Sequence, residues 1–274
     1  PWDGVSYKIS GINHMAWLLE ISRNGEDLYP IIRKRAQEGP IYAPTLALRE
    51  LHPEYADRIP SVAEQFTPDN HHDMVRFEIM KQFGYFVTES SEHSSEYYPW
   101  FIKKDHPELI DRFHIPLDEY PRRCRDQIAR WKQQAEHLVH NENLTHTRSS
   151  EYAAGIIEAL ETGRTFGFAG NVLNTGLIDN LPFDACVEVS CMVNEGHLSP
   201  CHMGPLPNQL AALNRRQIEV HQLTVDAALT RKKEYIYQAA MLDPHAGSEL
   251  TIDEIRSLVD DLIQAHGDWL PEYH

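Results

Sequence analysis

The stretch VSYKISGINHMAWLLEISRNG, residues 5–25, decides the fold of the opening of this chain. Val5–Ile9 has the residue pattern of a strand, and the apolar run Met15–Ile21 continues the extended conformation. Asn24-Gly25 then supplies a dipeptide that signals a tight turn. The sequence therefore predicts a β opening in which the pair Asn13-His14 lies beside a short apolar stretch.

Further along the chain, apolar residues recur at the spacing of a helix in three segments. Asp73–Phe83 is predicted to be a helix that ends at Gly84, because glycine suits a left-handed C-terminal cap. Leu117–Val139 has its apolar residues on one stripe, which predicts a helix that packs into the core. A long helix is predicted over Pro207–Met241, and Asp243-Pro244 ends it.

Strands and a final helix complete the expected elements. Thr165–Phe168 and Cys186–Val193 have strand character, and the turn-rich loop between them is dominated by small residues and amides. Thr251 and Glu254 are spaced as a capping box, so the last helix is expected to begin there and to end before Gly267.

These elements define the fold class. Five prolines break the pattern of Leu28–Phe66, which predicts short helices in a mobile, surface-exposed excursion. The chain shows no internal repeat, and strands precede a mostly helical C-terminal half. We therefore expect an α+β fold with a mixed sheet, formed as one domain over residues 1–274.

Charge and composition exclude several classes of protein. The net charge of −16 argues against binding of nucleic acid, because such binding depends on basic clusters that release counterions. No apolar run reaches the length of about 20 residues that spans a membrane, and the start of the chain does not resemble a signal peptide. We expect a cytoplasmic protein without a membrane partner. The four cysteines are far apart, which predicts reduced thiols.

Several motifs together resemble one family of enzymes. The matching stretches are GINHMAW at 11–17, FGYFVTESSEHSSEYYPWFIK at 83–103, IPLDEYPRRC at 115–124, GLIDNLP at 176–182 and HGDWLP at 266–271. With these motifs the chain resembles the C-terminal portion of the family-four glycoside hydrolases, especially their bacterial α-galactosidases. The resemblance implies a fold like the C-terminal part of lactate dehydrogenase. It also implies a preceding Rossmann half with a glycine-rich NAD loop and a metal-binding Cys-His-Ser motif, and this chain contains neither.

The resemblance implies a redox mechanism that differs from the usual pair of carboxylates. In this family, bound NAD⁺ takes a hydride from C3 of the sugar, a base then removes the C2 proton, and the aglycone leaves by elimination. Mn²⁺ chelates the C2 and C3 oxygens and stabilises the enediolate. An α-galactoside is the expected substrate, and a homo-oligomer is the expected assembly. Alternatives are an α-glucosidase or α-galacturonidase of the same family, or a non-catalytic sugar-binding module if no NAD-binding half exists.

The Asn-His pair carries the metal prediction. A neutral imidazole is the commonest transition-metal ligand, and the resemblance makes His14 the Mn²⁺ ligand, with a cysteine from the preceding half as its companion. Judged on the residues alone, a single histidine in an apolar strand is more often a hydrogen-bonded core residue. Asn13 is expected to orient a sugar hydroxyl or a metal-bound water, and its alternative is an amide that closes a strand end.

The polar and acidic segment 85–98 is predicted to bind the sugar. Glu89 or Tyr85 is the expected base at C2, whereas the alternative gives Tyr85 a place in the core and pairs Glu89 with Arg76. Arg76 is otherwise expected to face an anionic intermediate or the cofactor phosphates, or to be a solvated surface residue. The other expected substrate contacts are Ser90, Ser91, His93, Asn174 and Asn180, and the two asparagines have turn formation as their alternative. Tyr97, Tyr98 and Trp100 are expected to wall a sugar face, with core packing as the alternative for Trp100. Cys201-His202 is rejected as a metal pair because adjacent residues of an extended chain point to opposite faces.

Overall fold

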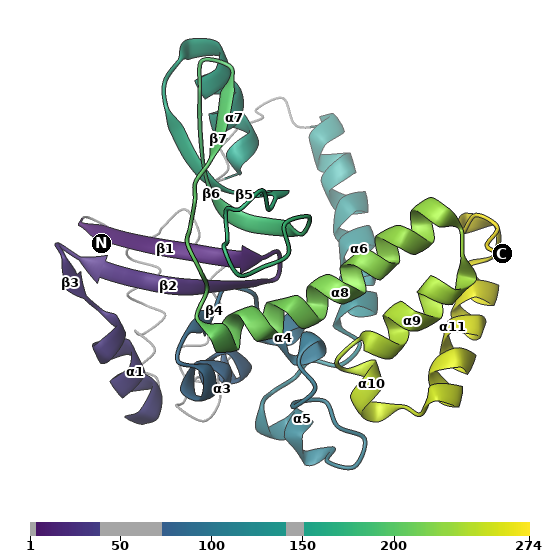
Figure 1. Ribbon diagram of the computed structural model, residues 1–274. Helices are drawn as coiled ribbons and strands as arrows, with labels where there is room; N and C mark the ends of the chain where they lie inside the picture. The colour runs from purple at the N-terminus through teal and green to yellow at the C-terminus, as the bar shows by residue number, and fades with distance from the viewer. Residues whose placement is uncertain (1–3, 39–72, 141–150) are drawn as a thin grey trace.

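The structure is a computed structural model that describes residues 4–38, 73–140 and 151–274 (Figure 1). Its centre is a seven-stranded sheet in the order β3-β2-β1-β6-β5, with β4 paired to β2 and β7 paired to β6. Every pairing in these residues is antiparallel. Helices surround the sheet and make up most of the C-terminal half, so the expected α+β class is confirmed. The expected mixed sheet is corrected, because the described strands form an antiparallel sheet.

The opening of the chain forms a β-hairpin. Strand β1 (Val5–Ile12) pairs with β2 (Met15–Arg23), and the turn between them consists of the Asn13-His14 pair, with His14 at a φ of 65°. A second turn at Asn24-Gly25 leads into β3 (Glu26–Asp27), as predicted. Gly11 is needed just before the hairpin turn, because a Cβ there would lie 2.7 Å from the carbonyl oxygen of Met15. Local sequence therefore fixes the position of His14 at the tip of the hairpin.

Short elements follow the hairpin and flank it. Helix α1 (Tyr29–Glu38) is the described part of the proline-rich excursion, and the remainder of that prediction lies outside the described residues. Helix α3 (Met74–Phe83) ends at Gly84 with a left-handed φ of 83°, which confirms the predicted cap. The chain continues through β4 (Phe86–Val87), α4 (Ser91–Tyr97) and α5 (Glu108–Arg112).

The second half of the sheet comes from residues after 150. Helix α7 (Tyr152–Thr162), which the sequence analysis did not predict, precedes β5 (Phe166–Leu173). The predicted strand Thr165–Phe168 thus continues through Gly170-Asn171, because the whole of β5 pairs in register with β6 (Cys186–Asn194). Strand β7 (His197–Pro200) extends the sheet beyond β6.

The C-terminal helices form an arm that extends from the sheet. The long helix predicted over Pro207–Met241 is wrong as a single element, because the chain breaks between α8 (Asn208–Thr230) and α9 (Lys233–Leu242). Arg231 takes a left-handed φ of 63° there, and its N–H caps the helix on the carbonyl oxygen of Ala227. Helix α10 (Ala246–Glu249), helix α11 (Ile252–His266) and the 3₁₀ turn η2 (Gly267–Trp269) follow, and α11 begins with the predicted capping box.

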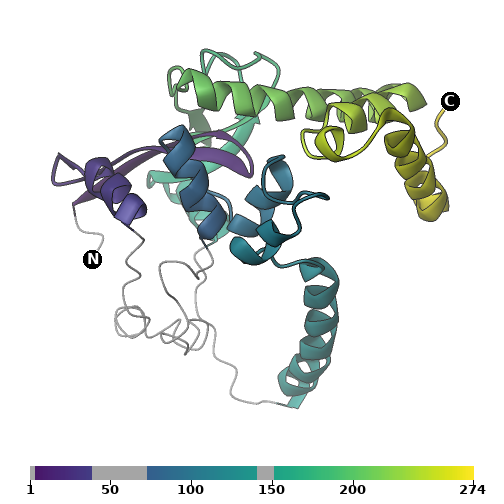
Figure 2. The ribbon, with the colours of Figure 1, turned by 90° about the horizontal axis from the view of Figure 1, so that it is seen from below.

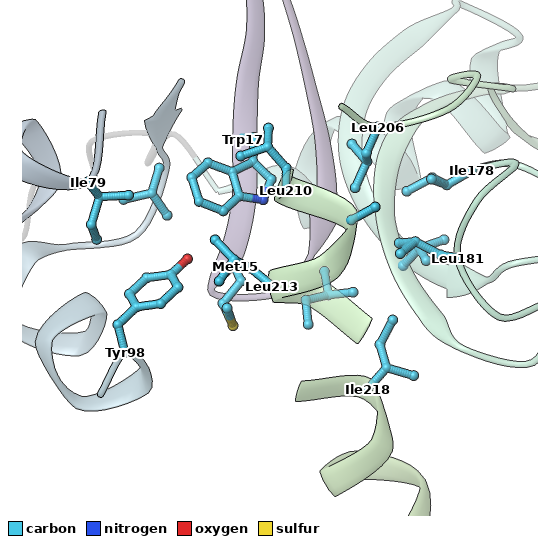
Figure 3. Close-up of a cluster of buried hydrophobic side chains, with 14 of the residues drawn as sticks. Met15, Trp17, Ile79, Tyr98, Ile178, Leu181, Leu206, Leu210, Leu213 and Ile218 are labelled. Atoms are coloured by element: carbon cyan, nitrogen blue, oxygen red, sulfur yellow. The ribbon is translucent and has the colours of Figure 1, made fainter. Parts of the chain in front are cut away.

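A buried core joins α8 to the hairpin and to the loop before β6. Trp17, Leu210 and Ile178 are fully buried in it (Figure 3). Asn214 of α8 is also fully buried, and it accepts a hydrogen bond from Trp17 Nε1 at 3.3 Å and donates one to the Met15 carbonyl at 2.9 Å. Helix α8 therefore holds the hairpin by both apolar and polar contacts.

Helix α6 (Glu119–His140) departs from its prediction. The expected helix Leu117–Val139 forms, but its expected packing into the core is wrong, because the described part of the chain buries none of its residues. Figure 2 shows α6 projecting away from the sheet. An amphipathic stripe shows that a helix needs a partner, but it does not show where in the protein that partner lies.

The structure also bears on two expectations about the chain, those for the cysteines and for membrane spans. All four cysteines are free thiols, as expected from their spacing. Among the described helices, none combines the length and the hydropathy that a transmembrane span requires.

Candidate active site

His14 is the centre of a polar cluster at the tip of the β1–β2 hairpin. Its side chain is 46% exposed, and its ring nitrogens face two groups from elsewhere in the chain. Nδ1 lies 2.8 Å from the hydroxyl of Tyr97, and Nε2 lies 3.5 Å from Oε2 of Glu89. The imidazole is therefore hydrogen-bonded and open to solvent, in contrast to the alternative of a core histidine. Asn13, beside it in the turn, is also exposed.

Helix α4 supplies most of the groups around His14. Ser90 begins this helix as its N-cap, and its side chain accepts a hydrogen bond from the backbone N–H of His93 at 3.3 Å. His93 and Tyr97 are four residues apart, which places them on one face of the helix. The ring of His93 stacks on that of His14 with centroids 5.6 Å apart. The backbone N–H of Ser90 donates to Oε1 of Glu89 at 2.7 Å, which leaves Oε2 directed at His14.

Charge and burial shift the protonation of several groups in the cluster. The hydrogen bond from His93 Nδ1 to Glu96, 2.9 Å long, raises the pKa of His93. Burial raises the pKa of Tyr97, so its hydroxyl stays neutral at physiological pH. The pKa of Glu188 is raised by burial, while His14 acts to lower it and Glu89 to raise it.

Glu188 was not found by sequence reasoning. It lies on β6, where its Cα faces that of Gly11 across the β1–β6 pairing, and it is half-buried. One signal could have found this residue. It is a glutamate in the middle of a strand, between the two buried residues Val187 and Val189. Such a signal does not say which other residues the carboxylate approaches.

The donor atoms of this cluster suit a divalent ion of the first transition row. Imidazole nitrogen and carboxylate oxygen are both ligand types that Mn²⁺ accepts. His14 and Glu89 present one of each on the open side of the hairpin tip. Among the described residues no group of three or more His, Cys, Asp or Glu side chains forms a complete metal site. The cluster can therefore contribute some of the ligands of such an ion.

Arg76 has a different position from the one expected. Its guanidinium binds Asp73 at 2.9 Å and donates to the carbonyl oxygens of Val87 and Thr88, so it holds β4 against α3. It also lies over the ring of Phe86. The alternative pairing of Arg76 with Glu89 is not observed.

Other residues expected at the sugar are engaged in structural contacts. The hydroxyl of Ser91 accepts a hydrogen bond from the backbone N–H of Arg76. Asn174 is fully buried, and its amide binds the backbone of Ile178 and of Leu181 and Pro182. The amide of Asn180 exchanges hydrogen bonds with the backbone of Leu206. These three side chains hold loops in place.

The expected aromatic residues divide between the cluster and the core. Tyr85 lies against Tyr29 and under the guanidinium of Arg33, apart from the contacts that surround His14. Tyr98 is buried in the core, and it stacks on the partly exposed Trp100. Of the aromatic residues expected to wall the sugar, only Tyr97 contacts His14 in the described part of the chain.

Cys201 and His202 are adjacent in the chain but contact different parts of the protein. His202 lies 2.7 Å from the carboxylate of Asp179, on the outer surface, while Cys201 packs against the core. The imidazole of His202 is therefore on the surface, whereas the thiol of Cys201 faces the core.

Comparisons with known proteins agree with the sequence resemblance. Residues 9–246 match the family described as the family 4 glycosyl hydrolase C-terminal domain. An α-galactosidase of Bacillus subtilis is 54% identical over 99% of this chain and 56% of its own length. An α-galactosidase of Rhizobium meliloti is 30% identical over 99% of this chain and 52% of its own length.

A solved structure has the same fold. It is a 6-phospho-α-glucosidase from gut microorganisms in complex with NAD and Mn²⁺, which superimposes with a TM-score of 0.67 at 20% identity and covers 100% of this chain and 57% of that one. The chain thus spans about half the length of the relatives it matches.

Proposed function

Because this chain belongs to the family 4 glycosyl hydrolases, of which it matches the C-terminal domain, we propose that it is the substrate- and metal-binding part of an α-galactosidase. Two relatives that match nearly the whole chain are named α-galactosidases, and this supports the choice of sugar. In this proposal residues 1–274 act together with an NAD-binding half, and the whole protein hydrolyses α-galactosides.

The single observation that carries the proposal is the environment of His14. Its two ring nitrogens have different neighbours, and a metal ligand needs this arrangement. In this proposal Nδ1 is the protonated nitrogen and its N–H donates a hydrogen bond to the hydroxyl of Tyr97, 2.8 Å away, since a neutral phenol oxygen can accept one. Nε2 is then the unprotonated nitrogen, and it points to the open side beside Glu89. His14 would hold Mn²⁺ through Nε2, with further ligands from sugar hydroxyls and from the NAD-binding half.

Glu89 is the residue of this chain best placed to move a proton. Its Oε1 is fixed by the N–H of Ser90, so Oε2 has a defined direction beside the metal ligand. A carboxylate held this way can take the proton from C2 of the sugar, provided that the proton lies within hydrogen-bond reach. Tyr85, the other base considered, contacts Tyr29 and Arg33 instead, so we propose Glu89 for this step.

The remaining chemistry belongs to groups that bind to the protein. When bound, Mn²⁺ supplies Lewis-acid polarisation of the sugar oxygens, and NAD⁺ supplies reversible hydride acceptance. This chain's part is to orient the sugar at the hairpin tip, where Asn13 and His93 offer polar side chains beside His14.

The test is His14→Ala in the full-length enzyme. Removing a metal ligand is expected to weaken Mn²⁺ binding at least 100-fold, measured by electron paramagnetic resonance of free Mn²⁺ during titration, since even loss of a supporting contact costs 10- to 100-fold. Turnover of p-nitrophenyl α-galactoside should fall with it, while NAD⁺ binding is retained. His202→Ala is the matched control, because it removes another exposed histidine with a carboxylate partner. Unchanged Mn²⁺ affinity in His14→Ala would refute the assignment of the ligand.

The sugar is tested separately. The wild-type enzyme is expected to prefer p-nitrophenyl α-galactoside over the α-glucoside and the α-galacturonide. A preference for either of the other two would replace α-galactosidase by the corresponding activity and would leave the metal assignment intact.

A further inference from the structure

A second cavity adjoins the cluster around His14. We call it the α4–α6 cavity; it has a volume of about 550 Å³ and lies between α4 and the start of α6. His93 lines it from α4, and the same imidazole stacks on the ring of His14. The cavity and the candidate metal ligand therefore share one wall. The remaining lining residues are Glu92, Glu96, Ile102, residues 115–121 and Arg123.

Fixed charges line one side of this cavity. Arg123 bridges two carboxylates: its Nη2 donates to Glu92 at 2.8 Å and its Nε donates to Glu119 at 2.9 Å. The two carboxylates are only 13% and 12% exposed, whereas the side chain of Arg123 is 55% exposed. No contact within the described residues uses Nη1 of Arg123. This nitrogen is therefore a donor that two ion pairs hold in place and that a ligand can reach.

Apolar and aromatic groups line the other side of the cavity. Ile115 is buried in the core and Ile102 packs against the same core, so this floor is fixed. Tyr120 is 77% exposed and offers a ring face together with a hydroxyl. A sugar ring likewise combines apolar C–H groups with hydroxyls. Pockets for small ligands combine apolar walls with a few placed polar groups, and their volumes are about 300–1,000 Å³.

The loop that leads into α6 frames the cavity in a strained conformation. His114 has a φ of 50° and Asp118 has a φ of 55°. This left-handed region is uncommon for residues other than glycine, and residues held in it cluster at active sites and around ligands. Pro116 restricts the loop between them. The frame of the cavity is therefore shaped before any ligand binds.

We infer that the α4–α6 cavity binds the leaving group of the substrate, and that this group is a neutral sugar. The inference rests on the proposed function, in which Glu89 takes the proton from C2 of the galactose. The leaving group is attached to the neighbouring carbon, C1. Helix α4 begins two residues after Glu89 and carries His93 and Glu96 of the cavity. A sugar joined at C1 would therefore extend from the hairpin tip along α4 into the cavity.

The charges of the lining favour a neutral sugar. Four carboxylates line the cavity, those of Glu92, Glu96, Asp118 and Glu119. The cations paired with them, Arg122, Arg123 and a protonated His93, balance three of these charges at most. A negative charge remains, and it repels a sugar that carries a phosphate or a carboxylate. The hydroxyls of a neutral sugar can instead donate to the carboxylates and accept from Nη1 of Arg123.

The first test compares two substrates of the full-length enzyme that differ in the leaving group. In melibiose the galactose is α-linked to O6 of glucose, whereas methyl α-galactoside releases only methanol. Arg123→Ala is expected to lower the ratio of kcat/KM for melibiose to that for methyl α-galactoside by roughly 10-fold or more, chiefly through KM, since a hydrogen bond from a charged group contributes that much to binding. Tyr120→Ala should lower the same ratio, and it removes an exposed side chain. Arg125→Ala is the matched control, because it removes an exposed arginine of α6 that does not line the cavity.

The outcomes separate this inference from the proposed function. If the wild-type enzyme hydrolyses neither galactoside, both are wrong. If it hydrolyses them and the ratio is the same in wild type, Arg123→Ala and Tyr120→Ala, the inference alone is overturned. An equal effect of Arg125→Ala also overturns it. Circular dichroism shows whether Arg123→Ala folds, and Tyr120→Ala decides the result if it does not.

The second test measures binding of the leaving sugar itself. Glucose is titrated into the full-length enzyme in the presence of saturating galactose, and its dissociation constant is obtained by saturation-transfer NMR. Arg123→Ala should raise this constant by roughly 10-fold or more, because the guanidinium donor is lost. Glucose 6-phosphate should bind more weakly than glucose, because the lining repels its charge. Tighter binding of the phosphate, or a glucose affinity that Arg123→Ala does not change, would contradict a site for a neutral leaving group.

Discussion

Substitution of Asn214 by alanine is expected to be strongly destabilising, although the residue lies on a helix face about two turns from the start of α8. Its amide is fully buried between α8 and the hairpin. It accepts a hydrogen bond from the indole of Trp17 and donates one to the carbonyl of Met15. Met15 follows the His14 turn directly, so these two bonds fix the start of the strand that follows the candidate metal ligand.

The magnitude follows from the groups that Asn214→Ala would leave behind. The indole N–H of Trp17 and the Met15 carbonyl would each lose a partner in a site closed to water, at a cost of about 1–3 kcal/mol for each group. The lost side chain also leaves a small cavity. We expect the two unpaired groups to lower the free energy of unfolding by about 2–6 kcal/mol together, and the cavity adds to this loss.

Urea unfolding followed by circular dichroism measures this loss. Asn208→Ala is the control, because Asn208 is an exposed residue of the same helix and should change stability by less than about 0.5 kcal/mol. A double-mutant cycle with Trp17→Phe should show coupling of about 1 kcal/mol, since the phenylalanine variant has no indole donor to leave unpaired. A loss below about 0.5 kcal/mol in Asn214→Ala, or no coupling with Trp17, would refute the reasoning.

Two further predictions concern pH. The hydrogen bond from Lys103 lowers the pKa of Glu249 to about 2, so the contact between α10 and the loop before α5 stabilises the fold above the ordinary glutamate pKa near 4.5 and is lost as the pH falls toward 2. Glu249→Gln should therefore flatten the acid limb of the stability profile between those values in thermal melts, and an unchanged limb would contradict the assignment. The pKa of His93 is raised chiefly by its bond to Glu96, so the stabilisation from this pair is complete below the ordinary histidine value of about 6.5 and is lost as the pH rises through the raised pKa. Glu96→Gln should lower the pKa of His93 in an NMR titration, and an unshifted titration would show that another group holds the proton.

The elements that the sequence predicted correctly are those with local signals. Gly84 ends α3 because its left-handed φ costs little for glycine, and the Thr251–Glu254 capping box begins α11 because its bonds lie within four residues. The break after α8 had no such signal. Arg231 takes a left-handed conformation that is unusual for arginine, and apolar residues continue at helical spacing on both sides of it. Tertiary packing of α9 back against α8 decides that break, and a single sequence does not contain it.

The candidate site shows the same division between local and long-range information. The Asn13-His14 pair could be chosen as a candidate because the family motif is local, although the turn that exposes His14 was not predicted. Tyr97 and Glu188 approach it from α4 and β6, elements separated from the hairpin by tens of residues. The tautomer of His14 depends on Tyr97, and the charge balance at Glu188 depends on His14 and Glu89.

A histidine becomes useful to a metal only when its second nitrogen has a partner, so the chemistry of the site depends on pairings across the fold. The residues that the sequence motif marks as polar divide accordingly. Ser91, Asn174 and Asn180 bind backbone groups that would otherwise be unpaired, whereas Glu89 and His93 remain directed at His14. Polar residues near a site can either hold the backbone or face a ligand. The direction of each side chain decides which of the two it does.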